Sequence, residues 1–314
     1  MPPQPTPPLQ LIGIDFTSAP TPRKPITVAR GRLQGARVSL QRVDALPSFA
    51  AFEALLGEAG PWVGGFDFPF GLPRELVQVL GWPRHWPALM GHYAALSRPQ
   101  IRDTFAAFCA ARPVGAKFAH RACDGPAGSS PSMKWVNPPV AFMLHAGVPR
   151  LIAAGVRLPA LADGDAARVA LEAYPGLLAR ELIGLRSYKS DQRARQTPER
   201  LIARKDIVEA LEQGRTRLGL RLRLSHAQRD ALAADASGDR LDAVLCLMQA
   251  AWATAQPRFG LPAHVDPLEG WIISAQAMDR AAPQATTKSR RRLTTARSAR
   301  DVVANTAVRS TEVA

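Results

Sequence analysis

The chain has 314 residues, of which 46% are hydrophobic and 21% are charged, a composition typical of globular proteins and unlike that of disordered or fibrous ones. Its 40 lysines and arginines outnumber its 26 aspartates and glutamates, so the formal net charge is +14 at pH 7. This excess favours phosphate-rich partners, nucleic acid first and an anionic membrane second. The three cysteines form no CxxC pair, which disfavours a disulfide framework or a structural zinc site.

The two ends of the chain differ in composition from the middle. Residues 1–9 are rich in proline and lack the apolar core of a signal peptide. Residues 276–314 lose hydrophobic periodicity and carry eight basic residues against three acidic ones. We predict that both segments are disordered, with the run from Lys288 to Arg292 either contacting phosphate or simply solvated, and that one domain covers residues 10–275. No apolar run reaches the length of about 20 residues that spans a bilayer, so we expect a cytoplasmic protein with no membrane partner.

The first part of the domain follows the order strand, strand, strand, helix, strand. Strands are predicted by apolar and β-branched runs at residues 9–16, 26–30, 37–43 and 62–66. A short glycine-bearing stretch separates the second run from the third, which suits an antiparallel hairpin. Ser48, placed just before a helical apolar repeat, predicts the N-cap of the helix.

Farther along, the patterns are mainly helical. Helices are predicted at residues 73–80, 100–111, 176–185, 197–212 and 241–255, and a strand at 169–172. The last of these helices has the clearest apolar face. A basic loop rich in proline and glycine is predicted at residues 112–139.

Acidic residues stand where predicted strands end. Asp15, Asp67 and Glu172 each close a strand, and Asp239 and Asp242 lie at the start of the last predicted helix. Because the carboxyl ends of neighbouring strands meet in one crevice of an open α/β sheet, we expect these carboxylates to converge. Carboxylates held together repel one another unless a cation lies between them, and their oxygens suit Mg²⁺ or Mn²⁺. Two such ions can stabilise both the attacking and the leaving oxygen of a phosphodiester displacement.

Each acid also has a structural explanation. Asp15 and Asp67 suit turns that terminate strands. Asp239 suits a helix N-cap, and Glu172 suits the capping of the helix that follows it. Asp242 is harder to explain in this way, because it lies beside the apolar face of its helix and points partly inward.

Basic and aromatic residues near these acids are candidate substrate contacts. Arg186 and Lys189, on either side of Tyr188, could contact phosphates or belong to a solvated loop. The loop at 112–139 combines charge with a stacking surface, as single-strand binding requires, in Lys117, His120, Arg121, Lys134 and Trp135. A histidine in a loop, such as His120, is either a general base or a structural group.

Five short blocks occur in a recognisable order. They are GIDFTSAP at 13–20, FDFPFGLP at 66–73, EAYPG at 172–176, YKSD at 188–191 and DRLDA at 239–243. With these blocks, and with GLP at 260–262 and DPLEGW at 266–271, the chain from about residue 10 to 273 resembles the domain of unknown function 429 family. That family is described as predicted nucleases with a ribonuclease H-like fold.

The resemblance implies a mixed α/β sheet in which the first three strands are antiparallel and the later ones parallel, flanked by helices. A loop and helical insertion at about 82–161 departs from a minimal ribonuclease H. The resemblance also implies that Asp15, Asp67 and Asp242 ligate metal, with Asp239 as a further ligand and Glu172 as an additional catalytic ligand or a structural acid. We therefore expect a nuclease that uses Mg²⁺ or Mn²⁺ to hydrolyse DNA or RNA.

Two other functions remain open. A non-catalytic nucleic-acid-binding or scaffold protein would have the same fold and the same basic surface. An actin-like ATPase or sugar kinase shares the core fold but cradles phosphate on glycine-rich hairpins after the first strand. The segment from Asp15 to Ser18 has no glycine, which disfavours the kinase.

Overall fold

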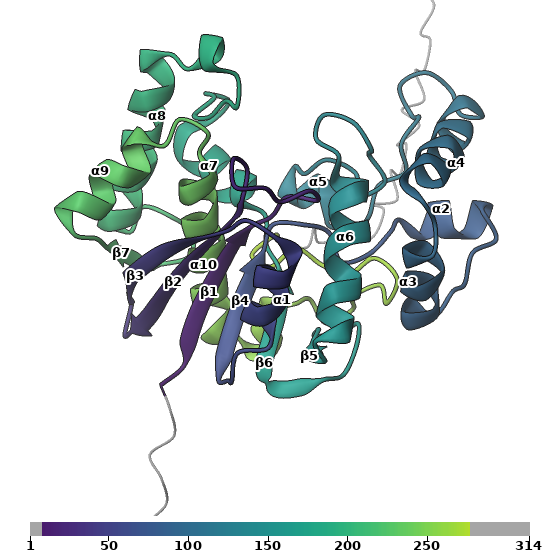
Figure 1. The fold of residues 1–314 in the computed structure, drawn as a ribbon, viewed down its shortest axis with the longest axis horizontal. Helices are drawn as coiled ribbons and strands as arrows, with labels where there is room; N and C mark the ends of the chain where they lie inside the picture. The colour runs from purple at the N-terminus through teal and green to yellow at the C-terminus, as the bar shows by residue number, and fades with distance from the viewer. Residues whose placement is uncertain (1–7, 277–314) are drawn as a thin grey trace, which may run out of the picture. The chain divides into compact units, whose positions relative to one another are not determined.

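A mixed sheet organises residues 8–276, which are the residues that the computed structural model describes (Figure 1). Its strands are β1 (Gln10–Asp15), β2 (Ile26–Gln34), β3 (Arg37–Leu46), β4 (Trp62–Phe66), β5 (Val156–Arg157), β6 (Asp165–Glu172) and β7 (Arg221–Arg223), in the spatial order β5-β6-β4-β1-β2-β3-β7. Strands β1, β2 and β3 are antiparallel, whereas β4 runs parallel to β1 and β6 runs parallel to β4. The predicted mixed α/β arrangement is confirmed, and it is consistent with a ribonuclease H-like fold. The predictions for the leader at residues 1–7 and the tail at 277–314 lie outside the described residues.

Helices flank the sheet. They are α1 (Phe49–Leu56), α2 (Arg74–Val79), α3 (Trp86–Ala94), α4 (Arg98–Ala110), α5 (Asp124–Ala127), α6 (Val140–Ala153), α7 (Pro175–Ile183), α8 (Pro198–Gln213), α9 (His226–Ala234) and α10 (Asp239–Thr254), with 3₁₀ turns η1 (Arg193–Arg195) and η2 (Pro257–Gly260). Ser48 caps α1 as predicted, since its hydroxyl accepts a hydrogen bond from the amide of Ala51 at 3.2 Å. Within residues 8–276, no helix combines the length and the hydropathy needed to cross a membrane.

Alternate residues of β1 face opposite sides of the sheet. Ile12 and Ile14 belong to one buried cluster, together with Phe52 of α1. Leu11 belongs to the other cluster, together with Leu245 of α10. Figure 1 shows α1 in front of the sheet and α10 behind it. Burial on both faces explains why the sequence of β1 is almost continuously apolar.

The helix α10 lies directly on β1 and β4, because glycines leave room for its backbone. A Cβ atom at Gly13 would stand 2.0 Å from the carbonyl oxygen of Ala243, and one at Gly65 would stand 2.5 Å from that of Cys246. Only glycine permits so close an approach. The first turns of α10 are therefore held against the carboxyl halves of both strands.

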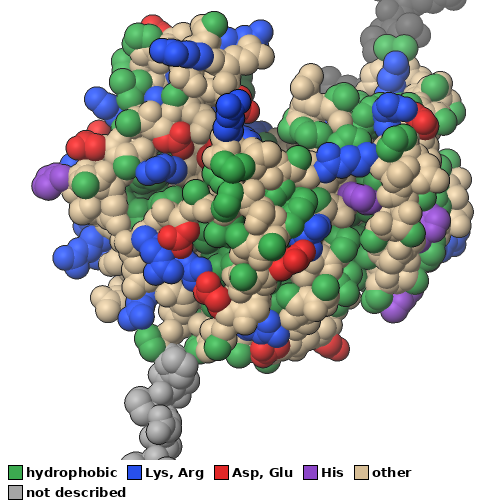
Figure 2. All heavy atoms as spheres, in the orientation of Figure 1, with side chains coloured by type: hydrophobic (Ala, Val, Ile, Leu, Met, Phe, Trp, Pro, Cys, Tyr) green, Lys and Arg blue, Asp and Glu red, His purple; other side chains and the backbone are tan. Residues whose placement is uncertain are grey.

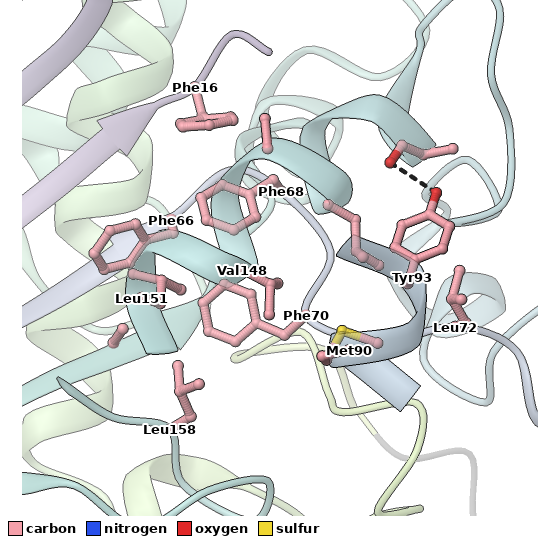
Figure 3. Packing of buried hydrophobic residues seen from close by; sticks show 14 of the residues in the cluster. Phe16, Phe66, Phe68, Phe70, Leu72, Met90, Tyr93, Val148, Leu151 and Leu158 are labelled. Carbon is pink, nitrogen blue, oxygen red and sulfur yellow. Dashed lines mark hydrogen bonds between the residues drawn. The ribbon is translucent and has the colours of Figure 1, made fainter. Parts of the chain in front are cut away.

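The insertion predicted at about 82–161 shares a core with the sheet. Figure 3 shows Phe66, Phe68 and Phe70 packed near Val148 and Leu151 of α6. The rings of Phe68 and Phe70 have centroids 5.3 Å apart. This aromatic cluster fixes the insertion against the end of β4, beside the residues that follow that strand.

Candidate metal centre

Three carboxylates that are distant in sequence meet at the carboxyl edge of the sheet. Asp15 ends β1, Asp67 directly follows β4, and Asp242 lies in the first turn of α10. One oxygen of each lies within 4.8 Å of the others. The amide of Asp67 donates a hydrogen bond to the carbonyl of Ile14 at 2.9 Å, so the pairing of β1 with β4 continues up to the site. The buried group of Asp15, Asp67 and Asp242 could bind a metal ion.

Burial makes this concentration of negative charge unfavourable. Asp15 is 9% exposed and Asp242 is fully buried. Burial, followed by the charge of Asp242, raises the pKa of Asp67 to about 7. The same two causes raise the pKa of Asp15 well above its usual range. A bound cation would favour the ionised carboxylates, and an all-oxygen donor set suits a hard divalent ion.

Tyr188 and Lys189 occupy both oxygens of Asp242. The hydroxyl of Tyr188 donates to Oδ1, and the ammonium of Lys189 pairs with Oδ2. Burial raises the pKa of Asp242, and the positive charge of Lys189 opposes that rise. The side chain of Lys189 is 42% exposed, so its ammonium reaches the centre from the solvent side. From the sequence, Lys189 could contact a phosphate or belong to a solvated loop; the structure places its ammonium on a carboxylate.

Asp239 lies outside the three-carboxylate group. Its carboxylate pairs with Lys24, from the loop between β1 and β2, at 2.9 Å. Lys24 also pairs with Asp191 at 2.8 Å. The interpretation of Asp239 as an N-cap is wrong, whereas its role as a further metal ligand stays a prediction. The N-cap of α10 is Gly238, and the charge of Asp239 is already neutralised by an ammonium group.

Glu172 and Arg121 form a buried ion pair beside the centre. Arg121 donates to Oε1 of Glu172 at 2.7 Å and to Oε2 at 2.8 Å, and the amide of Phe70 donates to Oε2 at 3.0 Å. Arg121 also pairs with Asp124 at 2.9 Å and is only 3% exposed. The guanidinium of Arg121 is buried in these ion pairs, at the wall of a cavity beside the centre, so a contact with substrate stays a prediction. Of the two roles expected for Glu172, the contacts fit the structural acid, which ties the insertion to β6.

The remaining predicted substrate contacts lie at the surface. Arg186 pairs with Asp206 at 2.7 Å and is 52% exposed. Lys117 is exposed and Lys134 is half-buried, both in the insertion. The ring of Trp135 packs against Phe118 with centroids 5.8 Å apart, so it is engaged in the core of the insertion.

A cavity of about 460 Å³ adjoins the carboxylates and is lined in part by Asp67, Tyr188 and Lys189. The sequence analysis did not predict the cavity, the hydrogen bond of the Tyr188 hydroxyl to Asp242 or the ion pair of Lys24 with Asp239. The position of Tyr188 next to Lys189 was a signal for its hydrogen bond. No local pattern indicates the ion pair, because Lys24 and Asp239 are 215 positions apart.

No family model, curated protein or solved structure matches the chain. The resemblance of the five sequence blocks to the domain of unknown function 429 family therefore stays a prediction.

Proposed function

We propose that the protein is a nuclease of the ribonuclease H-like type, in which Asp15, Asp67 and Asp242 hold Mg²⁺ or Mn²⁺. The observation that carries this proposal is the meeting of these carboxylates within 4.8 Å at the carboxyl edge of the sheet. Bound there, divalent ions would supply Lewis-acid stabilisation of the attacking and leaving oxygens of a phosphodiester.

The side chains around the carboxylates have distinct parts in this scheme. Tyr188 keeps the carboxylate of Asp242 oriented, because its hydroxyl donates a hydrogen bond to one of the carboxylate oxygens. Lys189 compensates the charge of Asp242 while no cation is bound. Because its side chain is 42% exposed, Lys189 is free to turn toward an incoming phosphate once a cation takes over that compensation.

The surface next to the centre suits a polyanion. Arg193 and Arg195 of η1 are exposed, and neither forms an ion pair with an acidic residue among residues 8–276. Arg200 donates to the carbonyl of Lys189 at 3.0 Å, which links this basic segment to the centre. Figure 2 shows blue side chains at the end of the molecule that carries α8, among others spread over this face. Contacts of this kind to phosphates supply affinity that does not depend on sequence.

A panel of labelled substrates tests the proposal. Wild-type protein is incubated with single-stranded, duplex, branched and RNA–DNA hybrid oligonucleotides in Mg²⁺, in Mn²⁺ and in EDTA. We expect cleavage of at least one substrate with metal only, and a loss of about a hundredfold or more in Asp15→Asn and Asp67→Asn. Asp163→Asn, at an exposed position, is the matched control. Cleavage that survives EDTA, or that both centre variants retain, would contradict the proposal.

A non-catalytic nucleic-acid-binding protein is the alternative, and the pairing of Lys189 with Asp242 favours it. That ion pair partly compensates the buried charge without any metal. Calorimetric titration with Mn²⁺ separates the two functions, because the nuclease requires binding that Asp15→Asn abolishes. If wild-type protein binds oligonucleotides but takes up no Mn²⁺, the alternative is correct.

A further inference from the structure

The cavity of about 460 Å³ beside the centre has walls from two separate parts of the chain. The helix α7 contributes Pro175, Ala179 and Ile183, which are spaced four residues apart and so share one face. The insertion contributes Val140 and Met143 at the start of α6. Its volume is within the range of about 300–1,000 Å³ that is typical of small-molecule sites.

A hydrogen-bonded bridge fixes the two walls against each other. Arg180 of α7 donates to the carbonyl of Gly128, in the insertion, at 2.8 Å, and to the hydroxyl of Tyr174 at 3.2 Å. Gly128 has a positive φ of 59°, and a Cβ atom there would stand 1.9 Å from the guanidinium of Arg180. The positive φ favours glycine at this position, and the hydrogen bonds of Arg180 connect α7 to the insertion beside the cavity.

The lining has the chemistry of a site for a planar, weakly polar group. Apolar atoms form most of its surface, and the hydroxyl-bearing Ser129 and Ser130 add polar groups. The lining also includes charged residues, of which Arg121 and Glu172 pair with each other and Arg180 bonds the carbonyl of Gly128. The flat face of a heterocycle would contact Met143 and Ile183, while hydroxyl groups could meet hydrogen-bonding atoms on its edge. Nucleobases combine these properties, because every base has a flat face and polar edges.

The charged residues around the cavity indicate that the ligand also has a phosphate group. Asp67 belongs to the lining and also to the carboxylate centre, while the lining also includes Lys189 and Arg186, whose charges pair with Asp242 and Asp206. A phosphate held at the centre would therefore lie next to a base held in the cavity. A nucleotide carries both groups, so one nucleotide would place its phosphate at the centre and its base in the adjoining cavity.

From this arrangement we propose that the cavity binds one unpaired base of a single-stranded nucleic acid, next to the phosphate at the carboxylate centre. The position of the phosphate rests on the proposed function, whereas the base-binding cavity does not. Within a duplex a base is paired and stacked, so it can enter such a cavity only after extrusion, which costs free energy. The substrate class that follows is single-stranded nucleic acid in preference to duplex.

Binding is measured in EDTA, which prevents metal-dependent hydrolysis and leaves the cavity lining of wild-type protein unchanged. The probes are two single-stranded pentamers, one with a central fluorescent 2-aminopurine and one with an abasic site at that position, each followed by anisotropy of an end label. We expect the abasic pentamer to bind about tenfold more weakly, as the loss of one stacked base predicts.

Variants that fill the cavity with a large side chain provide a second test of base binding. Met143→Trp and Val140→Trp each place a large ring in it, and both positions are only partly buried. Each variant should lose about tenfold in affinity for the 2-aminopurine pentamer while binding the abasic pentamer unchanged. Val79→Trp, on α2 at a position that is 67% exposed, is the matched control. The melting temperature of every variant identifies any that fails to fold.

The outcomes separate this inference from the proposed function. Equal binding of the two pentamers, or unchanged affinity in both cavity variants, overturns the base-binding cavity even if the protein is a nuclease. Base-dependent binding without metal-dependent cleavage by wild-type protein overturns the nuclease and supports the cavity. If wild-type protein cleaves single-stranded substrate faster than duplex of the same sequence, and Met143→Trp lowers that preference, both proposals are supported.

Discussion

Asp67 is an acid that the folded protein holds in an unfavourable ionised state when no cation is present. Its pKa rises from the usual value of 3.8 to about 7, first because it is buried and then because Asp242 is close. The folded state therefore binds a proton more tightly than the unfolded state does. The resulting stabilisation is fully present below about pH 4 and is lost as the pH rises toward 7.

Replacing Asp67 with a residue that does not titrate should remove this dependence of the stability on pH. In metal-free buffer, Asp67→Asn should be more stable than wild type at pH 8, and this gain should exceed the gain at pH 5 by roughly 1–3 kcal/mol, because each pKa unit corresponds to about 1.4 kcal/mol. Urea unfolding at the two pH values measures the difference. Asp163→Asn, which changes an exposed acid far from the centre in sequence, is the matched control. An equal gain at both values would contradict the raised pKa.

Lys189 should compete with a cation for Asp242, since both neutralise the same carboxylate. Lys189→Met should therefore bind Mn²⁺ more tightly, by roughly threefold to tenfold, on the scale of one partly exposed charge pair of about 1 kcal/mol. If Lys189 also turns toward phosphate, cleavage should fall in the same variant. Titration calorimetry gives the affinity, and Lys117→Met, at an exposed position in the insertion, is the control. Weaker Mn²⁺ binding in Lys189→Met would make the lysine a support of the centre instead of a competitor.

At the scale of elements, the contact of α10 with β1 and β4 sets the position of Asp242. Gly13 and Gly65 each lie two residues before an aspartate of the three-carboxylate group, and both touch the backbone of α10. Close packing along this contact leaves the helix little freedom to shift. The glycines are therefore part of what assembles the centre, although they carry no chemistry of their own.

Gly13→Ala tests this contact. The added methyl group would stand 2.0 Å from the carbonyl oxygen of Ala243, so α10 must move away from β1. We expect a loss of about 1–3 kcal/mol in stability, as overpacking typically costs, and weaker Mn²⁺ binding. Gly91→Ala, in α3, meets no atom within 4 Å and should leave both properties unchanged or slightly stabilise the helix. Native Mn²⁺ affinity in Gly13→Ala would show that α10 tolerates displacement.

The elements that could be predicted from sequence are those with a strong local pattern. The strands β1 and β4 and the helices α1 and α10 follow from apolar runs, a serine cap and a helical apolar face. The helix α6 was missed, since it contains Gly147 and Pro149, which argue against a helix, and is recognisable only by its burial. A Cβ atom at Gly147 would stand 2.5 Å from the ring of Phe68, so this glycine serves packing. The three-residue strand β7 is too short to give any periodic signal.

The residues of the candidate site also differ in whether a local sequence pattern could predict them. Asp15, Asp67 and Asp242 were predictable, because each marks the end or start of a recognisable element. The burial of Arg121 was not, since it depends on Glu172, 51 positions farther along the chain. A basic residue in a predicted loop gives no sign of whether it meets solvent or a buried acid. Pairings of this kind are set by the tertiary fold.

At the scale of the whole molecule, positive charge is shared between the folded domain and the tail. The segment at 277–314 has eight basic and three acidic residues. Removing it should weaken binding to nucleic acid and reduce its salt dependence, because each lost phosphate contact lowers the slope of log affinity against log salt by about 0.7 for single strands. Affinities measured over a series of salt concentrations give the slope, and the melting temperature checks that the domain stays folded. An unchanged slope would mean that the tail makes no phosphate contacts.

The carboxylates of the centre come from segments as far apart as β1, the first strand of the described chain, and α10, its last long helix. Two of the three, Asp15 and Asp67, are held together by neighbouring parallel strands, whereas Asp242 arrives only when α10 docks. During refolding, a high-affinity cation site cannot exist until these remote segments have come together. The appearance of Mn²⁺ binding during refolding would therefore report when the native topology is complete. A refolding intermediate in which the sheet has formed but α10 has not docked would not bind the ion.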